Sequence, residues 1–177
     1  MSFVMVDYEV NGKLPEWFEM FGLDKEVWEK RVEKIVERFF PELEDQLIHV
    51  RFLDFSNSRE YCCFHNLYAG FFHHQNLGIF INSNQWVSKE KLSRIVAHEL
   101  RHYVQLVKGE LSTEIQDQYA KANGGHSFAF RNAPWEIDAG MFEDQNWVKC
   151  CKVLFPEHFM PIESTLEEYL SKKGITK

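Results

Sequence analysis

One amphipathic segment constrains the fold of this chain more than any other. Residues 88–108 begin at Ser88, which predicts a helix cap, and end before Gly109. Apolar side chains recur between these points with the period of an α-helix, so one face of the helix is expected to be buried. Glu99 falls on that apolar face, where a carboxylate without compensation costs several kcal/mol. The position predicts that something compensates the charge of Glu99.

Two histidines flank this carboxylate in the order His98-Glu99-x-x-His102. Four residues turn a helix by ~400°, so the two imidazoles lie ~40° apart around the axis and ~6 Å apart along it. Both rings can then reach one Zn²⁺ at ~2.0–2.1 Å. Glu99 is rotated by ~100° from His98, so its carboxylate reaches a water rather than the metal. The spacing predicts zinc binding by His98 and His102, against the alternative of two surface histidines on a solvated helix.

A hydrolytic zinc site needs a third protein ligand, and the next long helix, expected over residues 132–154, offers one. Glu136 lies on the apolar face of that helix and is the favoured candidate, although an acid near a helix N-terminus is also stabilised by the helix dipole. Asp138 lies ~160° away around the helix and is rejected as a ligand. Glu143 lies ~10 Å further along the face of Glu136, and His126 precedes the helix, so both stay open as rivals.

His98-Glu99-x-x-His102, followed a few tens of residues later by a glutamate-bearing helix, resembles the gluzincin type of zincin metallopeptidase. The P-W-E-x-x-A sequence around Glu136 is similar to that of small bacterial and phage zincin-like proteins. The resemblance covers about residues 77–150. It implies that His98, His102 and Glu136 bind zinc and that Glu99 is the general base.

The chain departs from the gluzincin pattern at one position. In many gluzincins an acid four residues after the ligand glutamate orients a ligand histidine, but here Gly140 stands at that position. The orienting partner is therefore open, with Glu143 or a backbone carbonyl as candidates. The third histidine of the metzincin pattern is absent from the sequence after His102.

The resemblance implies a zinc-dependent hydrolase that cleaves peptide or protein substrates, with Glu99 as general base toward a metal-activated water. It also implies that residues 77–82 form an edge strand with which the substrate pairs. His126, Tyr119 and Arg131 are candidates for stabilising the oxyanion. Two other functions stay open: a zincin-fold metal-binding or regulatory protein that cleaves nothing, and a hydrolase of non-peptide amides.

The remaining pattern predicts a single α+β domain over residues 1–177, with a small mixed or antiparallel sheet packed on the two long helices in a zincin-like manner. Residues 69–76 are expected to turn within a hairpin. The expected strands are residues 3–10, 46–55, 61–68 and 77–82, and the expected further helices are residues 24–40 and 164–172.

Charge and cysteine usage narrow the environment and the partners. The net charge is −7, from 20 Lys+Arg against 27 Asp+Glu, which weighs against nucleic-acid or anionic-membrane partners. The cysteines form two neighbouring pairs, Cys62-Cys63 and Cys150-Cys151, which predicts reduced thiols and a cytoplasmic location. The first residues lack the basic segment of a signal peptide, and no apolar run approaches the ~18 residues that span a membrane. Sequence alone does not indicate an oligomeric state.

Overall fold

The computed structural model describes residues 3–5, 15–53, 70–73, 78–83, 86–125 and 129–159 of the 177 residues. The strands are β1 (Phe3–Met5), β2 (Leu47–Leu53), β3 (Gly70–His73) and β4 (Gly78–Asn82). The helices are α1 (Glu16–Met20), α2 (Lys25–Phe39), α3 (Lys89–Val107), α4 (Thr113–Ala122) and α5 (Pro134–Leu154). The expected α+β class is confirmed.

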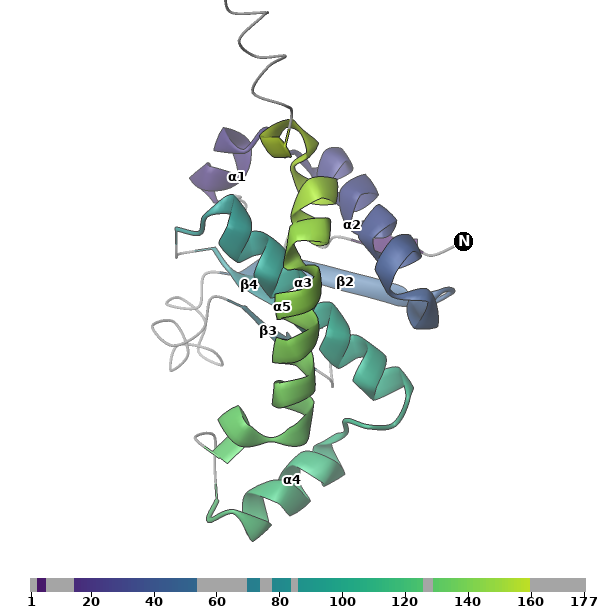
Figure 1. Ribbon diagram of the computed structural model, residues 1–177, viewed down its shortest axis with the longest axis vertical. Coiled ribbons are helices and arrows are strands. Elements are labelled where there is room, and N and C mark those ends of the chain that lie inside the picture. The colour runs from purple at the N-terminus through teal and green to yellow at the C-terminus, as the bar shows by residue number, and fades with distance from the viewer. Residues whose placement is uncertain are drawn as a thin grey trace, which may run out of the picture.

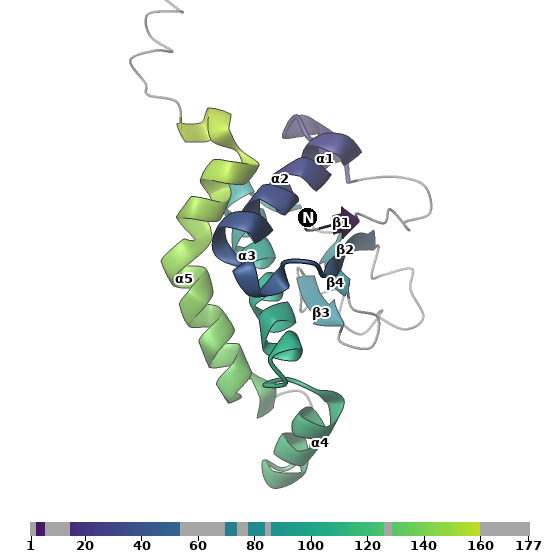
Figure 2. The ribbon, with the colours of Figure 1, turned by 90° about the vertical axis from the view of Figure 1, so that its right-hand side faces the viewer.

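The described elements form three layers, which Figure 1 and Figure 2 show from two directions. The sheet is one outer layer, α2 and α3 cover one of its faces, and α5 lies over these two helices. Helix α4 extends from the end of α3 and leads back to the start of α5. The long helix α3 is therefore covered by the sheet on one side and by α5 on the other.

The sheet is mixed, with the strand order β1-β2-β4-β3. Strands β1, β2 and β4 run parallel, whereas β3 is antiparallel to β4. Strand β4 thus lies inside the sheet, and the expectation that residues 77–82 form an edge strand is wrong. The run Gly78–Asn82 is apolar almost throughout and fully buried, as is typical of a strand paired on both sides.

The strand at the edge next to β4 is β3, which falls inside the expected turn over residues 69–76. A hairpin does join the two strands, with Phe71 opposite Phe80 and His73 opposite Gly78. The expectation that residues 70–73 belong to a turn is wrong. The expected strand over residues 61–68 and the expected helix over residues 164–172 lie outside the described residues, as do Cys62 and Cys63.

The long helices begin close to where their capping residues predict. The Asp24 side chain accepts a hydrogen bond from the backbone N–H of Val27 at 2.8 Å, and Ser88 accepts one from Lys91 at 3.0 Å. Each cap satisfies a backbone donor that has no partner within its helix. Helix α4 is capped in the same way by Ser112, which accepts a hydrogen bond from the backbone N–H of Ile115.

The apolar face of α3 lies in the main core. Leu92, Val96, Leu100 and Val104 are all fully buried in that cluster. A second, smaller cluster of Leu111, Ala133 and Trp135 connects the end of α3 to the start of α5. These two clusters position the first turn of α5 beside the second half of α3.

Cys150 and Cys151 lie near the end of α5 as buried free thiols. Burial raises the pKa of the Cys150 thiol to about 12, so this side chain behaves as a small apolar group.

We expect Gly70→Ala to lower the free energy of unfolding by about 1–3 kcal/mol, because β3 approaches α3 too closely for a side chain. A Cβ atom at Gly70 would lie 2.5 Å from Cγ2 of Ile95 and 3.1 Å from the carbonyl oxygen of Phe80. Urea denaturation measures the change, and a stability equal to that of the wild type would contradict this close packing.

Gly140→Ala serves as the matched control. The small side chains of Ala139 and Gly140 would allow another helix to approach closely, but among the described residues no atom beyond the neighbouring backbone of α5 lies within 4 Å of a Cβ built at Gly140. Alanine is favoured over glycine inside a helix, so this substitution is expected to raise the free energy of unfolding by about 0.5–1 kcal/mol.

Candidate metal centre

Three side chains from two helices meet between α3 and α5. His98 and His102 project from successive turns of α3, and their Nε2 atoms lie 3.1 Å apart. Glu136, in the first turn of α5, places Oε2 3.4 Å from Nε2 of His98 and Oε1 3.5 Å from Nε2 of His102. The structure therefore brings together the three residues that the sequence singled out as metal ligands.

The separations between these ligand atoms fit a single small metal ion. Zinc ligands at ~2.0–2.1 Å in a tetrahedron lie ~3.3–3.4 Å from one another. The observed separations of 3.1, 3.4 and 3.5 Å are close to that length. Two imidazole nitrogens and a carboxylate oxygen are also donors that a divalent transition metal accepts. His98, His102 and Glu136 could therefore hold one metal ion.

The position of Glu136 depends on contacts that anchor the first turn of α5 to α3. Gln105 donates from Nε2 to the carbonyl oxygen of Trp135 at 2.9 Å and to Oδ2 of Asp138 at 2.7 Å. Arg101 donates to both carboxylate oxygens of Asp138, at 2.7 and 3.1 Å. Asp138 is thus a helix-joining residue and lies outside the three-member group.

Each histidine has a partner at the ring nitrogen that faces away from the group. Nδ1 of His102 lies 2.8 Å from Oε1 of Gln105, and Nδ1 of His98 lies 3.1 Å from Oε2 of Glu143. Because the Gln105 nitrogen already donates to two acceptors, its oxygen accepts the Nδ1–H of His102. Metal-binding histidines commonly donate through their other nitrogen in this way, which leaves Nε2 free for the metal.

Glu143, which was considered as a rival third ligand, lies outside the three-member group. It contacts Nδ1 of His98 instead, where an orienting partner would lie, and its second oxygen accepts a hydrogen bond from Arg94 at 3.2 Å. The other rival, His126, lies outside the described residues.

Gln105 was missed by the sequence analysis, although it is only 1% exposed. On a helical wheel it falls on the polar side of α3 near Arg101, which predicts contact with solvent. Helix α5 covers this side of α3, so the amide is buried. The available signal was its spacing of three residues from His102, which places the two side chains together on a helix.

Glu99 lies beside the group and is not a member of it. Its residue is only 6% exposed, as the apolar surroundings of this position predict. Its negative charge raises the pKa of both His98 and His102, so the carboxylate is close enough to act on both rings.

The acidic partners change the proton affinities of the group. Burial opposes the charge on His98, but hydrogen bonds to Glu136 and Glu143 outweigh this effect and raise its pKa to about 10. Burial also opposes the charge on Glu136, and its hydrogen bonds to the two histidines lower its pKa to about 2. A metal ion would compete with protons for these atoms, so binding is expected to release protons.

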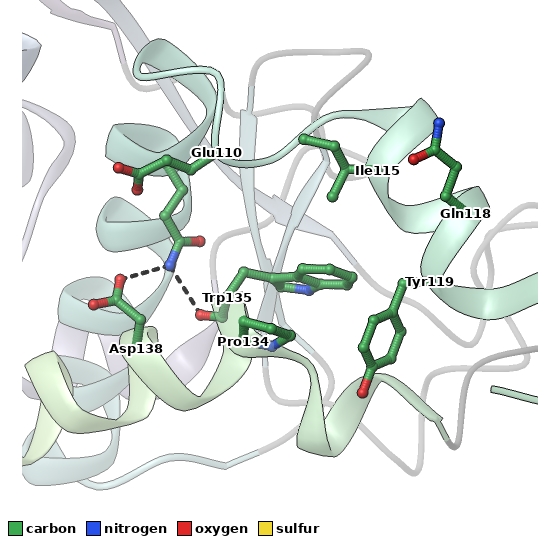
Figure 3. Close-up of a pocket in the computed structure, with 8 residues that line it drawn as sticks. Glu110, Ile115, Gln118, Tyr119, Pro134, Trp135 and Asp138 are labelled. Carbon is green, nitrogen blue, oxygen red and sulfur yellow. Dashed lines mark hydrogen bonds between the residues drawn. The ribbon is translucent and has the colours of Figure 1, made fainter. Parts of the chain in front are cut away.

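Of the residues considered for stabilising an oxyanion, only the Tyr119 side chain can be placed. Its ring lies 5.1 Å from that of Trp135, measured between centroids, on the opposite side of Trp135 from Asp138 (Figure 3). His126 and the side chain of Arg131 lie outside the described residues.

No protein-family model, curated protein or solved structure matches this chain. The resemblance to gluzincins therefore rests on the sequence motif alone. Among the helices that the structure describes, none combines the length and apolar character needed to cross a membrane.

We expect Glu136→Ala to lose metal far more severely than Glu143→Ala. Glu136 offers an oxygen to the group itself, whereas Glu143 lies outside the group and contacts Nδ1 of His98. Loss of an outer partner typically costs ~10–100-fold in metal affinity, and loss of a ligand should cost more. Metal content after dialysis, measured by mass spectrometry, compares the two variants. Equal zinc retention in both would remove Glu136 from the ligand set.

Gln105→Leu is expected to weaken metal binding by ~10–100-fold, because His102 loses the acceptor that orients it. Competition with a chromophoric chelator measures the dissociation constant. Gln145→Leu is the matched control, since Gln145 is exposed on α5. The role of Gln105 is contradicted if both variants bind zinc as the wild type does.

Proposed function

We propose that this chain is a zinc-dependent hydrolase with a zincin-like arrangement, acting on peptide bonds. The observation that carries the proposal is the convergence of His98, His102 and Glu136 at zinc-ligand separations, with a buried carboxylate beside them. Three protein ligands are the number that catalytic zinc sites use, since the fourth position is left for water or substrate.

When bound, zinc would polarise the substrate carbonyl and lower the pKa of a water to ~7. Glu99 would act as the general base that accepts a proton from the attacking water and passes it to the leaving amine. Its place suits this role, because its charge acts on both ligand histidines while it stays outside the group. Gln105 and Glu143 would hold the two imidazoles in the orientation that presents Nε2.

A peptide substrate could pair with β3, which takes the place at the edge of the sheet that was expected for residues 77–82. Within the described sheet β3 is an outer strand, and a peptide could add to such a strand through main-chain hydrogen bonds. Gly70 of β3 lies directly against Ile95, one helical turn before His98. A peptide paired with β3 would therefore run close to the metal centre.

We expect Glu99→Gln to retain zinc and lose hydrolysis by ~10²–10⁴-fold, because the amide cannot accept the proton. Purified protein is first analysed for zinc, and a broad peptide library is then digested with and without chelator. Glu114→Gln, an exposed site on α4, is the matched control and should keep wild-type activity.

Two outcomes would overturn the proposal in different ways. Unchanged hydrolysis by zinc-loaded Glu99→Gln would remove the general base from the mechanism. Stoichiometric zinc in the wild type without cleavage of any peptide would favour the metal-binding or regulatory protein instead.

A further inference from the structure

A pocket of about 600 Å³ lies between the end of α3, helix α4 and the start of α5. It adjoins the metal centre through two of its lining residues. Gln105 contacts Nδ1 of His102, and Trp135 immediately precedes Glu136 in the first turn of α5. A ligand in this pocket would therefore contact residues that adjoin two of the three candidate metal ligands, His102 and Glu136.

One side of the pocket is aromatic and well fixed. Trp135 is only 6% exposed and packs edge-on against Tyr119, at 5.1 Å between centroids and 71° between planes. Ile115 of α4 adds to this side. Because Trp135 is almost fully buried, the accessible apolar surface of this side comes mainly from Tyr119 and Ile115, which are only partly buried. An aromatic ring offers such a surface at little cost in side-chain entropy.

The other side of the pocket is acidic. Figure 3 shows the carboxylates of Glu110 and Asp138 on one side and Tyr119 on the other, with the Trp135 ring between them. Asp138 is already bonded to Arg101, whereas Glu110 is exposed and has no ion pair among the described residues. No lysine or arginine is among the lining residues. Asp138 and Glu110 share one nearby guanidinium, because the pKa of Arg101 is raised mainly by its hydrogen bond to Asp138 and further by the charge of Glu110. Two carboxylates against one guanidinium leave the pocket with a net negative charge next to an apolar surface.

We propose that this pocket binds the side chain of an arginine residue within a peptide. The aliphatic stem and the planar guanidinium would pack on Tyr119, beside the exposed edge of Trp135, and the charge would face Glu110. Arginine fits better than lysine, because its guanidinium both stacks on aromatic rings and pairs with a carboxylate through two N–H groups.

This inference rests on the proposed function in one respect: if the chain is a peptidase, the pocket sets a preference for arginine near the cleaved bond. The binding step itself needs no hydrolysis. It is therefore measured on the zinc-loaded Glu99→Gln chain, which should leave the peptides intact.

The probes are three capped five-residue peptides, with arginine, citrulline or phenylalanine between pairs of alanines. Citrulline keeps the shape of arginine without its charge. Nuclear magnetic resonance titration of the full chain gives each dissociation constant. We expect the arginine peptide to bind about tenfold more tightly than the citrulline peptide, a difference that corresponds to ~1.4 kcal/mol.

Glu110→Gln should bring arginine binding to within about threefold of citrulline binding, which is ~0.7 kcal/mol. Glu114→Gln, on an exposed acid of α4 outside the lining residues, should leave the preference unchanged. Tyr119→Leu should weaken both peptides together, because it removes part of the shared apolar surface.

Several results would overturn the proposal: no arginine binding at millimolar peptide, equal binding of arginine and citrulline, tighter binding of phenylalanine, or a preference that survives Glu110→Gln. These outcomes are separable from the fate of the hydrolase. If the chain prefers the arginine peptide but the wild type cleaves no peptide, the arginine pocket is supported and the peptidase function is contradicted. If the wild type cleaves peptides without regard to arginine or to Glu110, the peptidase function is supported and the arginine pocket is contradicted.

Discussion

The buried amide of Gln105 joins the two helices on which the candidate metal centre depends. Its nitrogen donates to two oxygens of α5 and its oxygen accepts from His102. A buried amide that loses such partners costs free energy, so all three bonds favour a single packing of the helices. Docking of α5, placement of Glu136 and orientation of the imidazole are therefore coupled in one event. Arg101 reinforces it through Asp138.

The parts that could be predicted from the sequence are those governed by local periodicity. The caps at Asp24 and Ser88 mark helix starts because side chain and backbone interact within one turn. The pairing of His98 with His102 follows from helical geometry alone. Glu136 was found because an acid on an apolar face needs a partner, and the structure supplies two histidines.

The parts that could not be predicted depend on which distant segments become neighbours. The expectation that residues 77–82 form an edge strand came from the resemblance to zincins. It fails because β2 pairs with the side of β4 that the hairpin partner β3 leaves free, and no local pattern reveals that pairing. Gln105 and Glu143 looked solvent-facing or ambiguous, since their surroundings exist only once α5 covers α3. The surroundings of Gly140 could not be predicted either. A small residue in a helix permits close approach of another helix, but none of the described residues packs closely against this position.

The two imidazoles of the candidate centre are not equivalent donors. A carboxylate backs His98, whereas a neutral amide backs His102. An anionic acceptor draws the Nδ1 proton more strongly and leaves more electron density on Nε2, which Arg94 moderates by sharing Glu143. A metal ion bound at the centre would therefore be held more strongly by His98 than by His102.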